Sequence, residues 1–308
     1  MAVITGNKKN NHKVGTPDPD QIVGLGGNDI LEGLAQNDEL YGGSGNDRLF
    51  GGDGIDLLLG DSGNDILEGG ANADGMGGGD GIDTLSYASS NAGVTIVLDA
   101  TGTISAASGG HATGDFGDGF ENITGSAFDD DLTGNDFRNV LKGGGGVDIL
   151  NGGAGKDILK GGDDNDEMTG GIGADILDGG AGADFVIYAA STAGVRITLG
   201  TNGAETIGKG GEAQGDRISN VEDVIGSSFN DVLIGNNRAN ALFGGAGDGK
   251  DILKGGGGGD VLFGNDGDDD LYGEAGNDWI SGGVGRDGCA ARHDRPLVVR
   301  WSIVRNRS

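Results

Sequence analysis

The sequence predicts an all-β repeat solenoid, arranged as three stacked blocks that are joined by short strand-containing interludes. The first observation is a nine-residue period, in which a Gly-x-x-Gly-x-Asp turn is followed two positions later by an apolar residue, as between Gly42 and Phe50. The second is the composition, with 71 glycines and 40 aspartates against nine glutamates. The third is that no stretch shows a helical apolar pattern. A fixed internal period decides the architecture before local propensity does.

The repeat units fall into blocks with regular boundaries. Each block holds seven units, and the third carries a two-residue insertion around Asp248. The predicted segments are degenerate N-terminal repeats or a leader (1–23), block 1 (24–86), an interlude (87–124), block 2 (125–187), a second interlude (188–225), block 3 (226–287) and an atypical basic tail (288–308). The two interludes are each 38 residues long and align without a gap, so block plus interlude repeats every 101 residues. This indicates duplication of a whole module.

Each nonapeptide divides into a six-residue Gly-rich turn and a three-residue strand whose middle side chain points inward. Two units close one coil, so residue i lies under residue i+18, one strand spacing of about 4.8 Å away. In each interlude the alternating segments 94–98 and 195–199 predict one further strand, with its apolar face covering the end of a repeat stack. The first two units after each interlude are degenerate, because Phe128, Phe137 and Phe229 occupy the fourth position where glycine is usual, and Asn139 and Asn240 replace the sixth-position aspartate of the second unit. We interpret these units as transition turns.

The stacked aspartates create an electrostatic problem that predicts a metal. Carboxylates about 5 Å apart repel by roughly 3 kcal/mol at an effective dielectric constant near 20. A hard cation removes this repulsion, and calcium takes six to eight oxygen ligands from carboxylates and backbone carbonyls. Magnesium demands a smaller octahedral cage and zinc prefers His and Cys, of which the chain has three and one. We therefore expect multiple Ca²⁺ ions, and folding that is coupled to their binding.

The candidate ligands are the aspartates at the sixth position of the units. In the three blocks 19 of the 21 sixth positions are Asp. The predicted metal ligands are Asp29, Asp38, Asp47, Asp56, Asp65, Asp74, Asp83, Asp130, Asp148, Asp157, Asp166, Asp175, Asp184, Asp231, Asp251, Asp260, Asp269, Asp278 and Asp287. Asp115, Glu121, Asp216 and Glu222 recur in the interludes, where a capping role is favoured and an extra calcium site is the alternative.

The Gly-Gly-x-Gly-x-Asp-x-Leu-x units resemble the RTX, or hemolysin-type, calcium-binding nonapeptide repeat. The repeats cover about two-thirds of the chain. The resemblance implies a parallel β-roll, which is a right-handed β-helix, with calcium bound between its turns. It also implies a bacterial protein that is secreted by type I export through an uncleaved C-terminal signal. The interludes resemble the linking segments of long RTX proteins.

Charge and composition exclude several partner classes. The formal net charge of −29 argues against nucleic acid and anionic membranes, because both are polyanionic. The N-terminal residues 7–13 are polar or basic and provide no cleavable signal core, and no apolar stretch is long enough to predict a transmembrane segment. The charge indicates calcium ions as partners, and the resemblance implies a secreted, extracellular protein without a cleavable N-terminal signal. Extracellular polysaccharide or a host surface is left open as a further partner.

No catalytic constellation is found, so the sequence predicts that the chain is not an enzyme. A Gly-x-x-x-x-Gly-Lys match from Gly244 to Lys250 lacks the following Ser or Thr, and an EF-hand-like run at Asp266 lacks its glycine and glutamate. The alternatives are an accessory module of a secreted enzyme, of the polysaccharide epimerase or metalloprotease type, or an adhesin or matrix protein. An exposed aromatic stripe would favour an adhesin, and Tyr41, Tyr272 and Trp279 are its candidates.

The tail departs from the repeat pattern after Asp287. Residues 286–308 hold six of the eleven arginines of the chain, and Cys289 takes the position where the core residue belongs. We interpret this stretch as a frameshifted or truncated end, with a basic interaction tail as the alternative. Under either interpretation, the tail departs from the C-terminal export signal that the resemblance implies, and this puts the competence of such a signal in doubt.

Overall fold

The computed structural model describes residues 2–291 and 298–300. The chain divides into two compact units, Met1–Gly153 and Ala154–Ser308, and the division falls inside the predicted second block. Both units are parallel β-solenoids, as predicted, and the described residues contain no α-helix. Their only helical turns are three 3-10 segments, η1 (Gly110–Ala112), η2 (Thr201–Gly203) and η3 (Gly211–Ala213).

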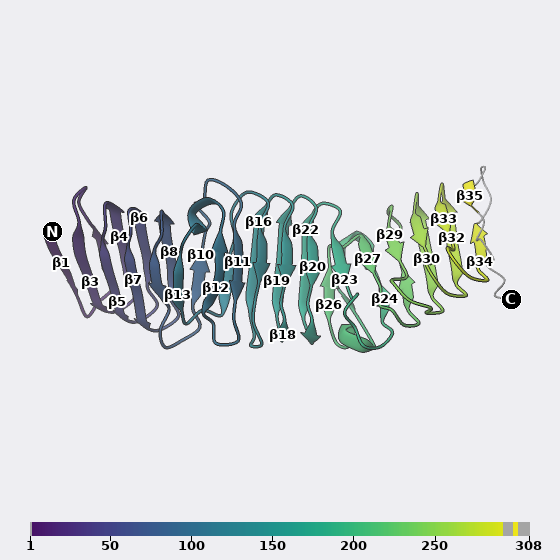
Figure 1. The fold of residues 1–308 in the computed structure, drawn as a ribbon, viewed down its shortest axis with the longest axis horizontal. Helices are drawn as coiled ribbons and strands as arrows, with labels where there is room; N and C mark the ends of the chain where they lie inside the picture. The colour runs from purple at the N-terminus through teal and green to yellow at the C-terminus, as the bar shows by residue number, and fades with distance from the viewer. Residues whose placement is uncertain (1, 292–297, 301–308) are drawn as a thin grey trace. The chain divides into compact units, whose positions relative to one another are not determined.

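In unit 1 successive strands alternate between two faces of the solenoid (Figure 1). One sheet contains β1 (Ala2–Asn7), β3 (Asp20–Gly26), β5 (Glu39–Ser44), β7 (Leu57–Ser62), β9 (Gly75–Gly77) and β13 (Phe116–Asp118). A second contains β2 (His12–Val14), β4 (Ile30–Ala35), β6 (Arg48–Asp53), β8 (Ile66–Ala71), β10 (Thr84–Ser86), β14 (Asn122–Thr124) and β16 (Val140–Gly145). A third contains β12 (Ile104–Ser108), β11 (Thr95–Leu98), β15 (Asp131–Thr133) and β17 (Ile149–Asn151).

Unit 2 repeats this organisation. One set of strands comprises β19 (Ile158–Asp163), β22 (Ile176–Ala181), β26 (Arg217–Ser219) and β25 (Thr206–Ile207). A second comprises β20 (Glu167–Thr169), β23 (Phe185–Ile187), β27 (Asp223–Ile225), β29 (Ala241–Phe243), β31 (Val261–Phe263), β33 (Trp279–Ser281) and β35 (Val298–Arg300). A third comprises β24 (Arg196–Thr198), β28 (Val232–Ile234), β30 (Ile252–Gly258), β32 (Asp270–Gly276) and β34 (Gly288–Ala291), and a small pair is formed by β18 (Ala154–Gly155) and β21 (Ile172–Gly173).

The register confirms the predicted coil of two nonapeptides. Leu31 pairs with Leu49, and Leu49 with Leu67, each 18 residues further along the chain. These eighth-position side chains point inward and have no exposed surface, so they form the core of the coil. The two-residue insertion lengthens one coil to 20 residues, because Leu233 pairs with Leu253, and the strand register resumes beyond it.

The interludes contain the predicted strands. Strand β11 pairs in parallel with β15, which places Ile96 beside Leu132 in the buried core, and β24 is the edge strand of its sheet, where it pairs in parallel with β28. Each strand therefore begins the parallel stack of the block that follows, which agrees with the expectation that its apolar face covers the end of a repeat stack. Between the strands, antiparallel β12 and the turn η1 form an excursion from the coil.

The C-terminal prediction falls mostly on residues 292–297 and 301–308, which lie outside the described residues. The described part of the tail adds β34 to β32 and β35 to β33, both in parallel. Cys289 pairs with Leu271 at the core register but is exposed. Within the described part of the chain, no helix has the length and hydropathy needed to cross a bilayer.

Candidate metal centre

Each repeat turn buries the carboxylate of its sixth-position aspartate against the neighbouring coil. Asp29, Asp47 and Asp65 follow one another at 18-residue steps and are each 1% exposed. The Oδ1 atom of Asp47 accepts the backbone N–H of Asp29, and the Oδ1 of Asp65 accepts that of Asp47, both at 2.7 Å. The carboxylates therefore bridge successive coils through hydrogen bonds, which the prediction of stacked charges did not include.

The second carboxylate oxygen is buried in the same turns and has no hydrogen-bond partner. Unpartnered Oδ2 atoms occur in Asp29, Asp38, Asp47, Asp56, Asp65, Asp74, Asp83, Asp175, Asp184, Asp260, Asp269, Asp278 and Asp287. A buried acceptor without a donor is rare in a folded protein and calls for an explanation such as an ion. The regular recurrence of this atom indicates one kind of ligand position in every such turn.

The first-position glycine of each turn makes room for a second oxygen. A Cβ placed on Gly33 would lie 2.5 Å from the Oδ2 of Asp38 and 2.5 Å from the carbonyl oxygen of Gly51, one coil further on. A Cβ on Gly42 would meet Asp47 and Gly60 in the same way, at 2.6 and 2.8 Å. Only glycine fits this position, and it leaves a carboxylate oxygen and a carbonyl oxygen facing one small space.

The second position of these turns takes a left-handed backbone conformation. Gly43 has φ 101° and Gly52 has φ 108°, which glycine adopts without steric cost. Leu25 and Leu34 occupy the same position with φ 79° and 84°. For a bulky residue this region is an outlier, so the turn geometry overrides the preference of the side chain.

Burial disfavours the charged form of these carboxylates. It raises the pKa of Asp65 and of Asp74 to about 7, with smaller contributions from neighbouring carboxylates. It likewise raises the pKa of Asp56 and Asp83 to about 6, while the cross-coil N–H bonds act in the opposite direction. In unit 2 the pKa of Asp251 is raised to about 7 for the same reason. Without a cation, the sites are thus poised to hold protons near neutral pH.

The donor set consists of oxygen atoms. No three His, Cys, Asp or Glu side chains come together as a metal-holding group in the ranges 2–291 and 298–300. Further ligands must therefore be backbone carbonyls, such as those of Gly51 and Gly60, as the sequence predicted. Carboxylates combined with carbonyl oxygens suit Ca²⁺ and not Zn²⁺.

The structure separates the predicted ligands into two environments. The residues with an unpartnered Oδ2 share the geometry described above, and Asp251 bridges coils similarly, by accepting the N–H of Asp231 at 2.8 Å. Asp148 accepts the N–H of Asp130, and Asp157 and Asp166 donate their N–H groups to Asp175 and Asp184. Asp130 and Asp231 differ, because serine donors occupy their carboxylates. The assignment of individual ligands stays a prediction.

The acidic residues of the interludes accept the last hydrogen bonds in the series that links sixth-position aspartates of successive coils. Asp115 accepts the N–H of Asp74 at 2.9 Å through Oδ1, and the hydroxyl of Tyr87 donates to its Oδ2 at 2.9 Å. The second interlude repeats this arrangement with Asp216, Asp175 and Tyr188. Glu121 and Glu222 accept the N–H groups of Asp83 and Asp184. Of the two interpretations left open by the sequence, these contacts favour capping, because both oxygens of Asp115 have protein partners.

A second ladder on the outer edge of the turns was missed by the sequence reasoning. The Oδ1 of Asn28 accepts the N–H of Asn46 at 3.1 Å, and the Oδ1 of Asn46 accepts that of Asn64 at 3.0 Å. Asn165 does the same for Ala183 in unit 2, at 2.8 Å. The signal was present as Asn at the fifth position, recurring every 18 residues. This ladder joins coils without a metal.

Comparison with known families agrees with the geometry. A profile of the RTX calcium-binding nonapeptide repeat matches residues 14–49, 50–85, 124–159, 152–186, 225–248, 246–280 and 254–288. These segments cover more than half of the chain and reach into all three predicted blocks, which confirms the resemblance. No curated protein sequence matched the chain.

Proposed function

Since the chain belongs to the RTX calcium-binding nonapeptide repeat family, we propose that it is a secreted β-roll protein that folds when it binds calcium. Calcium binding by such repeats is a property of the family, and the coupling to folding is our proposal. The observation that carries it is the pairing in each turn of a bridged Oδ1 with a buried, unpartnered Oδ2. Such a turn leaves one buried carboxylate oxygen without a donor, and a bound cation would be the partner of that oxygen.

The residues that would hold the ions follow from this pairing. They are the sixth-position aspartates with unpartnered Oδ2 atoms, together with backbone carbonyls such as that of Gly51 in the coil above. A bound Ca²⁺ supplies positive charge to buried carboxylates whose ionised form is otherwise disfavoured. The aspartate supplies a carboxylate oxygen, and the first-position glycine leaves space between that oxygen and the backbone carbonyl of the next coil. The left-handed conformation of the second position gives the turn its shape.

We propose a non-enzymatic, extracellular role. The family resemblance supports secretion by a bacterial type I system, and the absence of a catalytic motif in the sequence supports a structural or binding role. The accessory-module alternative requires a catalytic partner that these residues do not supply. Export through the C-terminus stays a prediction.

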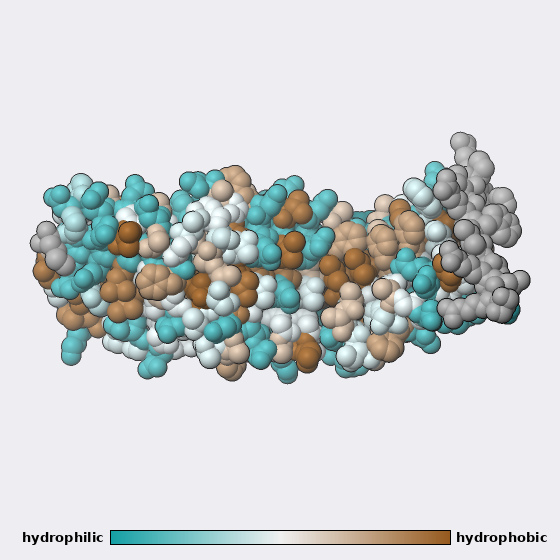
Figure 2. Space-filling model, in the orientation of Figure 1, coloured by the Kyte–Doolittle hydropathy of each residue, from teal (hydrophilic) through white to brown (hydrophobic). Residues whose placement is uncertain are grey.

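The aromatic side chains bear on the adhesin alternative. Tyr41, Tyr272 and Trp279 lie in three different sheets and form no common stripe. Unit 2 instead has a row of Phe243, Phe263 and Trp279, and apolar atoms gather over this region (Figure 2). Phe243 and Phe263 stack at 5.4 Å with an interplanar angle of 2°. Because their faces contact each other, they are not free to stack on a sugar, and the row supports the sheet instead.

A calcium titration tests the proposal. The full chain, prepared in calcium-free buffer, is titrated with CaCl₂ or MgCl₂ while far-UV circular dichroism follows β structure. We expect β signal to appear with calcium, and magnesium to be ineffective at the same concentration. Full β signal before calcium is added would contradict coupled folding, and an equal response to magnesium would contradict the choice of ion.

A further inference from the structure

The second position of the unit distinguishes two kinds of turn. In turns with an unpartnered Oδ2 this residue has a positive φ, whether it is glycine, as in Gly43, or another residue, such as Asp61 with φ 71°. Thr16, Ser126 and Ser227 occupy the same position without a positive φ. The backbone N–H of the residue is turned toward the carboxylate in these three turns.

Both oxygens of each carboxylate in the serine turns accept hydrogen bonds from protein donors. Ser126 donates its N–H to the Oδ2 of Asp130 at 2.5 Å and its hydroxyl to the Oδ1 at 3.0 Å, where the N–H of Val94 also donates at 2.7 Å. After the second interlude Ser227 makes the equivalent bonds to Asp231, with its N–H at 2.6 Å and its hydroxyl at 2.9 Å. Neither aspartate keeps a free oxygen for a cation.

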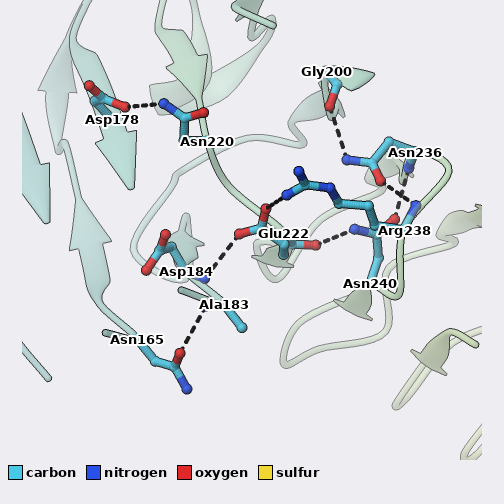
Figure 3. A network of polar contacts seen from close by, with 10 residues as sticks. All are labelled: Asn165, Asp178, Ala183, Asp184, Gly200, Asn220, Glu222, Asn236, Arg238 and Asn240. Atoms are coloured by element: carbon cyan, nitrogen blue, oxygen red, sulfur yellow. Dashed lines mark hydrogen bonds and ion pairs between the residues drawn. The ribbon is translucent and has the colours of Figure 1, made fainter. Parts of the chain in front are cut away.

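The second turn after each interlude has an asparagine at the sixth position in place of the aspartate. Asn236 donates its N–H to the Oδ1 of Asn240 at 2.8 Å, and the amide of Asn240 donates to the carbonyl oxygen of Glu222 at 2.7 Å (Figure 3). Asn135 and Asn139 repeat this arrangement after the first interlude. A neutral amide nitrogen thus bonds to a backbone carbonyl with no charge to balance. In the turns that follow both interludes, the oxygens of the sixth-position side chains therefore accept hydrogen bonds from protein groups.

We infer that Ser126 and Ser227 close their turns to calcium, so that Asp130 and Asp231 are structural residues and not ligands. This inference rests on the proposed calcium binding and refines it. A cation at Asp130 would have to displace two donors from Ser126, whereas at Asp65 it meets an oxygen that has no partner. Blocks 2 and 3 thereby begin with turns that need no metal, and their calcium turns lie beyond them.

Calcium stoichiometry of the full chain tests the inference. Equilibrium dialysis at saturating calcium is compared for the wild type, Asp130→Asn, Asp231→Asn, Asp65→Asn and Asp269→Asn, with circular dichroism verifying the fold. We expect Asp130→Asn and Asp231→Asn to bind as many ions as the wild type, and Asp65→Asn and Asp269→Asn to lose at least one. A loss in Asp130→Asn equal to that in Asp65→Asn would overturn the inference alone. No calcium uptake by the wild type would remove the proposed function and the inference together.

A gain of binding is the complementary test. Ser126→Gly removes the hydroxyl and permits the left-handed conformation, so it should open the turn and raise the stoichiometry by about one ion. Ser44→Gly serves as the control, because Ser44 is an exposed third-position residue. Stoichiometry unchanged in a folded Ser126→Gly would overturn the claim that this residue closes the site. If the glycine variant does not fold, the aspartate pair above still decides the inference.

Discussion

The Oδ1 of Asp65 accepts the backbone N–H of Asp47 across successive coils at 2.7 Å, while the Oδ2 of Asp65 is buried without a partner. One carboxylate therefore has two roles, because Oδ1 links successive coils and Oδ2 is the proposed calcium ligand. The two roles can be separated by substitution, since an amide retains the first oxygen and replaces the second.

Asp65→Asn and Asp65→Ala are expected to differ in stability when the other turns have bound calcium. The asparagine keeps the acceptor for the N–H of Asp47, whereas alanine leaves that buried N–H unsatisfied, at a cost of about 1–3 kcal/mol. Both variants should lose calcium at this turn. Urea denaturation at saturating calcium, where the other turns keep the chain folded, measures the difference in stability, with the exposed Asp53→Asn as a charge-matched control. Equal stability of the two variants would contradict the bridging role.

The fold was predictable from the sequence because its period is long, regular and tied to burial. Leu31, Leu49 and Leu67 were placed in the core by spacing alone, and their register follows from two units per coil. The aspartates were placed in stacks by the same spacing. What spacing does not reveal is how each oxygen is used, since that depends on backbone orientation at a neighbouring residue.

The difference between Asp65 and Asp130 illustrates this limit. Both occupy the sixth position, and only the second position distinguishes Asp61, with a positive φ, from Ser126. Ser126 was visible in the sequence, but the direction of its N–H was not.

The first-position glycine should be required and the third-position glycine should not. A Cβ on Gly255 would clash with the Oδ2 of Asp260 and lie 2.8 Å from the carbonyl oxygen of Gly273, whereas a Cβ on Gly257 meets nothing closer than 3.6 Å. We therefore expect Gly255→Ala to lose at least one calcium ion and to raise the calcium concentration needed for folding. Gly257→Ala should leave both unchanged. Calcium titration by circular dichroism compares the two, and equal behaviour would show that the space beside Gly255 is not used.

Relief of backbone strain should stabilise the first block. Leu34 is 44% exposed and has φ 84°, a conformation that costs a non-glycine residue about 1–2 kcal/mol. Leu34→Gly removes this strain but adds about 0.5–1 kcal/mol of chain entropy to the cost of folding, so a net gain of up to ~1.5 kcal/mol is expected. Leu57→Gly is the control, because Leu57 lies on a strand, is 37% exposed and has no positive φ. It should destabilise the chain in the same urea measurement, and a loss of stability in Leu34→Gly would refute the strain argument.

Acid should stabilise the calcium-free protein, opposite to its effect on calcium binding. Burial raises the pKa of Asp65 and Asp74 to about 7 and of Asp56 and Asp83 to about 6, against about 3.9 for an unfolded aspartate. The folded state therefore binds more protons between these values, and its stability rises as the pH falls from about 7 toward 4. Protons and calcium then compete for the same Oδ2 atoms, so calcium affinity falls over the same range.

Far-UV circular dichroism checks this linkage in buffers stripped of calcium by a chelating resin. The calcium-free chain should show more β signal at pH 5 than at pH 7.5, while the calcium concentration needed for half-maximal folding should be higher at pH 5. The Asp65→Asn and Asp74→Asn double variant should show a weaker pH dependence, because two of the carboxylates with raised pKa are gone. A β signal of the calcium-free wild type that falls on acidification would mean that these carboxylates are not buried in the metal-free fold.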